Sequence, residues 1–129
     1  MVAENRLIPR KKRNIMPAVN IFLAHRRFAS TDELRQFTLS ANGTAAKFLQ
    51  EVGLEEADPT KIKLIHKAEG ETLFRLLAGA PDFDRWGNKV RYLAGVYDTA
   101  VLVYEPNLMK TPEASSLYYL GRLVYKYIS

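Results

Sequence analysis

The chain has 129 residues, of which 47% are hydrophobic and 26% are charged, with a formal net charge of +5. This length suits one domain, whose single core needs no covalent staple. Cysteine is absent, which excludes a disulfide framework, a thiol nucleophile, an iron–sulfur cluster and a thiolate zinc site. No apolar run approaches the roughly 18 residues of a membrane span, and the charged start differs from a signal peptide. The sequence therefore predicts a cytoplasmic protein without a membrane partner.

The basic charge is concentrated at the N-terminus. Five of the 19 basic residues lie in the first 13 positions against one acidic residue, so this segment carries +4 and the remainder +1. We predict a basic, disordered leader over residues 1–16 and a single domain over 17–129. Met16 directly precedes the first strand-like run, so translation could start at Met1 or at Met16. The near-neutral remainder disfavours nucleic acid as a partner, except through residues 10–13.

The first part of the predicted domain contains one strand and two helices. Residues 18–25 form a mostly apolar run that predicts a central or near-central strand. Ser30 and Glu33 have the spacing of a capping box, which predicts that a helix begins here. A second helix is predicted from about residue 44 to residue 52, with Gly53 as its C-cap.

In the second part of the chain, apolar residues alternate between the spacing typical of strands and the spacing typical of helices. Residues 61–67 predict a half-buried strand, antiparallel or at a sheet edge, and residues 71–77 predict a short helix. Residues 82–95 predict an amphipathic helix, residues 99–104 a strand buried on both faces, and residues 117–127 a final strand. We expect the last two strands to pair as an antiparallel hairpin. This order predicts an α+β domain in which helices cover one face of a small, mainly antiparallel sheet.

Few residues suggest catalysis or cofactor binding. The two histidines, His25 and His66, lie at the ends of predicted strands and could share a metal with a carboxylate if those strands were neighbours. Their spacing matches no ligand motif, which favours a structural role. The glycines form no phosphate-binding fingerprint, and the serines lack a nucleophile-elbow context. The sequence therefore predicts no metal, no cofactor and no enzymatic activity.

Tyrosine is concentrated in the last third of the chain, where all seven tyrosines lie between residues 92 and 127. Alternate tyrosines in a strand are typical of ordinary sheet packing. They are also typical of recognition surfaces, and with lysines they could stack single-stranded nucleic acid. An alternative function is thus a small nucleic-acid-binding module that uses the basic leader and the sheet tyrosines.

Two segments resemble a known bacterial family. Residues 97–105 and 117–125 resemble the closing hairpin of the immunity protein 22 family, and residues 19–24 followed by residues 30–34 resemble its first strand–helix unit. The resemblance implies a protein that binds a cognate toxin stoichiometrically and neutralises it by occluding its active or substrate-binding surface. It implies no cofactor.

The resemblance also directs attention to exposed acidic groups, because many such toxins attack nucleic acid and carry basic sites. The predicted partner-binding residues lie in two segments: Glu55, Glu56 and Asp58 in the first, and Asp82, Phe83, Asp84 and Trp86 in the second. Trp86 would be the anchor and the carboxylates a steering rim. The alternative interpretation places Trp86 in the core and leaves the acids to keep the surface soluble.

Overall fold

The structure, a computed structural model, describes residues 17–39 and 46–125. It contains a four-stranded sheet in the order β3-β4-β2-β5, in which every neighbouring pair is antiparallel. In chain order the elements are β2 (Ala18–Ala24), α2 (Thr31–Thr38), α3 (Lys47–Val52), η1 (Pro59–Lys61), β3 (Ile62–Thr72), α4 (Leu73–Leu77), α5 (Phe83–Trp86), η2 (Gly87–Lys89), β4 (Val96–Tyr104), η3 (Pro112–Ala114) and β5 (Tyr118–Val124). The predicted α+β class with an antiparallel sheet is confirmed.

The two most apolar strands occupy the centre of the sheet. Ile21 of β2 lies opposite Leu102 of β4 on one side and opposite Gly121 of β5 on the other. Both side chains, Ile21 and Leu102, are fully buried. A strand with continuous apolar residues needs cover on both faces and a neighbour on both edges. The prediction of a central strand at residues 18–25 is therefore confirmed, and β3 lies at an edge as expected.

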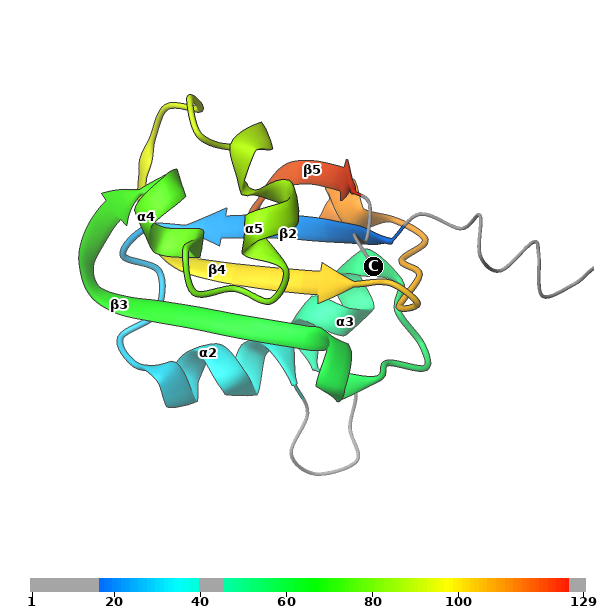
Figure 1. Cartoon of the computed structure of the whole chain (residues 1–129). Coiled ribbons are helices and arrows are strands. Elements are labelled where there is room, and N and C mark those ends of the chain that lie inside the picture. Colours follow the sequence, from blue (N-terminus) through cyan, green and yellow to red (C-terminus); the bar gives the residue numbers. More distant parts are fainter. Residues whose placement is uncertain (1–16, 40–45, 126–129) are drawn as a thin grey trace, which may run out of the picture.

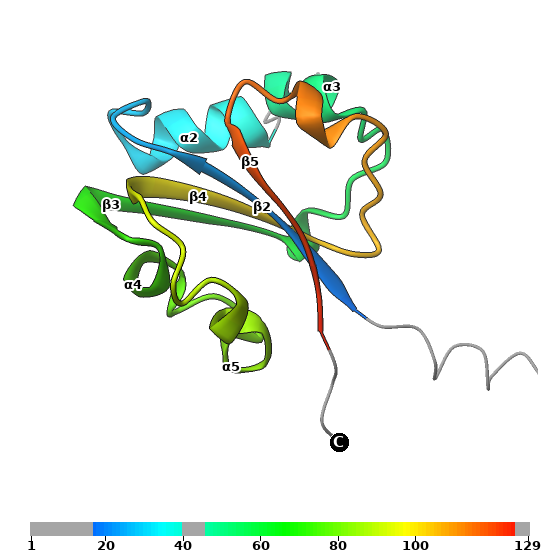
Figure 2. The same cartoon turned by 90° about the horizontal axis from the view of Figure 1, so that it is seen from above.

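Helices pack against both faces of the sheet rather than one (Figures 1 and 2). On one face α4 and α5 bury Leu76 and Trp86 against Ile21. On the other face α2 and α3 bury Leu34 and Phe48 in the cluster that holds Phe22 of β2. The predicted single covered face is thus wrong, because side chains alternate along β2 and both of its faces are apolar. Each face excludes water only with a helical layer of its own.

The expected hairpin between the last two strands does not form. β4 is hydrogen-bonded to β3 on one edge and to β2 on the other, so neither edge is available to β5. β5 instead lies on the outer edge of β2. The connection over residues 105–117 is long enough to carry the chain past β2, and sequence neighbours need not be sheet neighbours.

The predicted helix over residues 82–95 is shorter than its periodicity suggested. The α-helical part ends at Trp86, and the chain continues as the 3₁₀ turn η2. The ring of Phe83 lies against Gly87, where an added Cβ would come within 2.7 Å of that ring. Val90 is still fully buried after this turn, but no helix continues beyond Lys89, and Leu93 is 45% exposed instead of lying on a buried helical face.

Both predicted helix caps are present. The Ser30 hydroxyl accepts the backbone N–H of Glu33 at 3.1 Å, while the Glu33 carboxylate accepts the N–H of Ala29 at 3.2 Å. The box therefore closes one residue earlier than a standard capping box. Gly53 ends α3 with φ 70°, a left-handed conformation that favours glycine.

Candidate functional site

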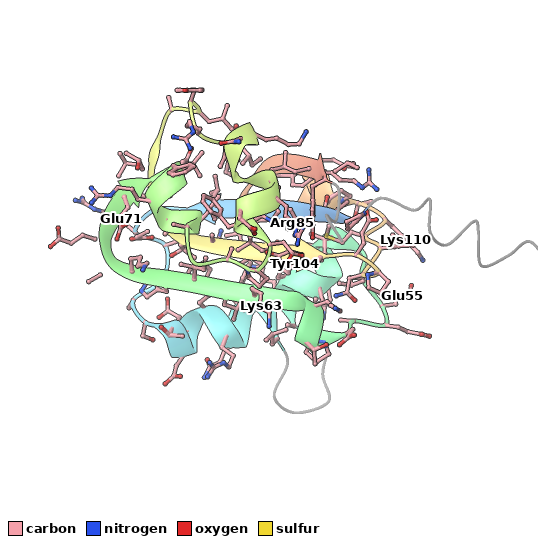
Figure 3. The ribbon with its side chains drawn as sticks, in the orientation of Figure 1. Glu55, Lys63, Glu71, Arg85, Tyr104 and Lys110 are labelled. Carbon is pink, nitrogen blue, oxygen red and sulfur yellow. The ribbon has the colours of Figure 1, made fainter. Side chains whose placement is uncertain are left out.

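The first predicted group of acids lies on one exposed loop. We name the segment with Glu55, Glu56 and Asp58 the acidic loop; it joins α3 to η1. All three side chains are exposed. The Glu55 carboxylate pairs with Lys110 Nζ at 3.2 Å, and Figure 3 shows these two residues at the same end of the molecule. The loop therefore presents three carboxylates to solvent from one short segment.

The acidic loop is held in place from behind by the β4–β5 connection. The buried Asn107 side chain accepts the Asp58 N–H at 2.8 Å and donates to the Asp58 carbonyl at 3.0 Å. The backbone N–H of Thr111 donates to the Val52 carbonyl at 2.9 Å. These bonds join segments about fifty residues apart in sequence, since Asp58 and Asn107 are separated by 49 positions. The loop backbone is thus ordered before any partner binds.

Asp58 also caps the 3₁₀ turn that follows it. Its carboxylate accepts the Thr60 hydroxyl at 2.6 Å and the Thr60 N–H at 3.0 Å. The hydroxyl bond, followed by the backbone bond, lowers the pKa of Asp58 below its usual value. Asp58 therefore remains ionised at neutral pH and contributes charge to the loop.

The second predicted group does not join the first. Its residues belong to α5, which packs on the opposite face of the sheet from α3 (Figure 2). Trp86 is fully buried, and its indole N–H donates to the Pro81 carbonyl at 3.1 Å. The interpretation of Trp86 as an exposed anchor is therefore wrong, because the ring fills the core beneath α5.

The acidic residues of α5 have mixed roles. Asp82 adopts φ 61°, and its carboxylate accepts the Tyr125 hydroxyl at 3.0 Å, which ties the start of α5 to the end of β5. Asp84 is exposed, whereas the Phe83 ring packs edge-on against Trp86 at 5.2 Å. This segment therefore stabilises the fold, and only Asp84 offers an exposed carboxylate.

The two histidines flank a buried polar pair. β4 separates their strands, and the Thr99 hydroxyl donates to Asp98 Oδ1 at 2.8 Å while lying 3.0 Å from His66 Nδ1. Because the hydroxyl hydrogen is directed to Asp98, the Thr99 oxygen accepts the Nδ1–H of His66. His25 Nδ1 lies 3.9 Å from Asp98 Oδ2 on the other side. Sequence reasoning missed Asp98 and Thr99, whose only signal is a polar pair at the start of an apolar strand.

The environment of Asp98 keeps this buried carboxylate ionised. Burial is the largest single influence and raises its pKa. The hydrogen bonds from the Arg26 N–H and the Thr99 hydroxyl, together with the charges of the histidines, outweigh burial and lower the pKa below 3.8. Among residues 17–39 and 46–125, no three His, Asp or Glu side chains gather closely enough to hold a metal ion. The arrangement favours the structural interpretation of both histidines.

The sheet tyrosines are mostly part of the packing. The Tyr119 hydroxyl donates to Asn20 at 2.6 Å, and the Tyr104 hydroxyl donates to the Pro81 carbonyl at 2.6 Å. Tyr118, in contrast, is 57% exposed and stacks on Tyr97 with ring centroids 6.3 Å apart. These contacts agree with the packing interpretation for the buried tyrosines and leave Tyr118 at the surface.

Exposed large hydrophobic side chains, which sequence reasoning missed, flank the start of β4. Of the five in the described chain, Tyr92, Leu93 and Val96 lie within five consecutive residues, and a fourth, Tyr118, stacks on Tyr97 of β4. We name these four residues the aromatic end. Exposed apolar side chains of this size are typical of interaction sites. The sequence signal of the aromatic end was hidden because Leu93 fitted the periodicity of a buried helix face.

Comparisons with known proteins returned no match: no protein-family model, no curated protein and no solved structure matches this chain. The resemblance to the immunity protein 22 family stays a prediction. None of the helices in the described part of the chain is long and apolar enough to cross a membrane.

Proposed function

We propose that the protein binds a cognate protein toxin and neutralises it by covering the toxin's active or substrate-binding surface with the acidic loop. The observation that supports this most directly is the anchoring of that loop by Asn107, which holds the backbone of Asp58 at both its N–H and its carbonyl. An ordered loop loses little conformational entropy on binding. Its exposed carboxylates favour fast, orientated encounter with a basic surface.

The charge of the loop indicates the chemistry of the surface that it covers. A protein surface that binds nucleic acid is basic, because it contacts phosphates through lysine and arginine. Glu55, Glu56 and Asp58 are complementary to such a surface. The proposed partner is therefore a toxin that attacks nucleic acid, and the loop would occupy the surface that binds its substrate.

The alternative of a nucleic-acid-binding module has less support. Helices pack on both sheet faces, so the sheet presents no open platform on which bases could stack (Figure 2). The hydroxyls of Tyr104 and Tyr119 are used in internal hydrogen bonds. That alternative then depends on the basic leader, including residues 10–13, which lies outside the described residues.

Co-purification with the product of the adjacent upstream gene tests the proposal. We expect a tight one-to-one complex and loss of the toxin's activity in that complex. The double substitution Glu55→Gln and Glu56→Gln should weaken binding by about tenfold or more, mainly through slower association. Asp32→Asn is the matched control, because Asp32 is an exposed carboxylate on α2 outside the loop.

The control should bind like the wild-type protein. Failure to form a complex contradicts the proposed function. Equal binding by the double variant and the wild type contradicts the assignment of the acidic loop as the binding surface. Binding to RNA or DNA that persists after deletion of residues 1–15 would instead favour the alternative function.

A further inference from the structure

The leader joins the domain at the end of the sheet that carries the acidic loop. Pro17 precedes β2, and the Ala18 carbonyl accepts the Glu105 N–H at 3.0 Å, just after β4 ends. Asn107, two residues further on, holds the backbone of Asp58. The start of β2, the end of β4 and the acidic loop therefore lie at the same end of the molecule (Figures 1 and 2).

This end of the molecule carries an excess of negative charge even when its lysines are counted. We name it the acidic end, and it comprises residues 51–61 and 105–113, which the hydrogen bonds described above join together. Its two segments contain six acidic and two basic residues. Arg122 adds a third cation by pairing with Glu105 at 2.6 Å, which leaves a net charge of −3. The first 13 residues carry the opposite charge, +4.

The leader is long enough to place its basic residues over the acidic loop. Residues 10–13 lie five to eight positions before Ala18, and an extended chain covers roughly 17–29 Å over those positions. The route from Ala18 to Asp58 crosses the hydrogen bond to Glu105, two residues of chain and the side chain of Asn107. This route is shorter than about 20 Å, so the basic residues can reach the carboxylates.

A second feature of the acidic end is an exposed apolar side chain. Leu108 is 70% exposed and follows Asn107, which anchors the acidic loop. In the leader, Leu7 and Ile8 stand shortly before the basic run of residues 10–13. Contact between these apolar side chains would remove surface from water on both sides. The leader therefore matches the acidic end in apolar character as well as in charge.

We propose that residues 7–13 of the leader fold back onto the acidic end of their own chain and cover the acidic loop and Leu108. A segment tethered this closely meets its site at an effective concentration in the millimolar range, so the contact forms within one chain. Because it pairs opposite charges at the surface, added salt weakens it. Its regulatory role rests on the function proposed above: the leader excludes weakly binding basic surfaces, and the cognate toxin displaces it.

Carbodiimide crosslinking of the full chain, without any toxin, tests this contact, because the reagent joins a lysine amine to a nearby carboxylate. At about 20 mM salt we expect crosslinks from Lys11 and Lys12 to the acidic loop, detected by mass spectrometry of peptides. Lys110 and Glu55, whose charged atoms are 3.2 Å apart, are the internal positive control. Exposed Asp84, on the opposite face of the sheet from α3, is the negative control. At about 500 mM salt the leader crosslinks should fall at least about fivefold.

Two variants weaken the contact without removing any group that is crosslinked. The double substitution Arg10→Gln and Arg13→Gln retains both leader lysines, and Leu108→Ser retains every carboxylate. Each should lower the yield of leader crosslinks by about threefold or more. The matched controls are Arg35→Gln, which removes an exposed charge from α2, and Tyr92→Ser, which removes an exposed ring from the aromatic end. Both should crosslink like the wild type.

A mixture of isotope-labelled and unlabelled chains shows whether a crosslink forms within one chain. Leader crosslinks that are absent at low salt, that form equally to Asp84, or that join labelled to unlabelled chains overturn the proposal. Yields that respond neither to salt nor to the two variants also overturn it. Since no toxin is present, these outcomes are independent of the proposed function. A leader that contacts the acidic end in a chain that binds no toxin would contradict the proposed function alone.

Discussion

Removing the side chain that anchors the acidic loop should destabilise the whole domain. Asn107 is 4% exposed and makes two hydrogen bonds with the backbone of Asp58. Asn107→Ala leaves a backbone N–H and a carbonyl of Asp58 without these partners. At about 1 kcal/mol for each bond, the free energy of unfolding should fall by about 2 kcal/mol. For a domain of this size the midpoint of thermal unfolding should fall by about 6–10 °C.

Urea unfolding measures this loss, with the fluorescence of the single tryptophan as the probe. Asn88→Ala is the matched control, because the Asn88 side chain is exposed and bonds only to exposed Arg91 among the described contacts. The control should change the free energy of unfolding by less than about 0.5 kcal/mol. If Asn107→Ala is no more costly than the control, the loop is not held by Asn107.

Three further predictions concern the rest of the fold. The pKa of Asp98 is lowered, so its carboxylate stabilises the fold above the unfolded-state pKa of about 3.9, and this contribution is lost as the pH falls through the folded-state pKa. Asp98→Asn should therefore flatten the fall in unfolding free energy below about pH 4, measured by urea titrations at several pH values. Gly53→Ala should lower the free energy of unfolding, measured by chemical denaturation, by at least about 1 kcal/mol, because φ is 70° and the new Cβ would meet Lys110 Cβ at 2.9 Å. Gly79→Ala is the control and should leave that free energy nearly unchanged, because nothing lies within 4 Å of the added Cβ. Because Trp86 is fully buried, iodide should quench its fluorescence poorly, and efficient quenching would mean that the ring is exposed. Trp86→Ala should lower the free energy of unfolding by about 3–5 kcal/mol.

The features that were predicted correctly depend on residues close together in the sequence. The cap at Ser30 needs only the amide of Glu33, three positions away. The end of α3 needs only a residue at position 53 that tolerates a positive φ. The strand character of β2 and β4 follows from continuous apolar runs, whose burial on both faces also indicated a central position. Each of these signals is complete within a short window of sequence.

The sequence also identified the acidic loop as exposed, because three acids in a short connection are costly to bury. It did not reveal how the loop is anchored. Asn107 lies 49 positions from Asp58, and an asparagine after a proline in a connection is equally typical of an ordinary turn. The aromatic end was missed for a related reason. Leu93 has the spacing of a buried helical residue, but the helical segment ends at Lys89, and Leu93 lies beyond it.

The amino-acid sequence by itself determined the class of the fold, the types of most elements, the caps of two helices and the exposure of the acidic loop. The tertiary structure decided the strand order, the cover on both sheet faces, the burial of Trp86 and the grouping of Asp98 with two histidines. The physical reason is the range of the interactions. Helical caps and side-chain periodicity act over a few residues, whereas the bond between the Arg26 N–H and Asp98 joins residues 72 positions apart. Which distant segments meet depends on how all the apolar faces can be covered at once, and no local pattern contains that information.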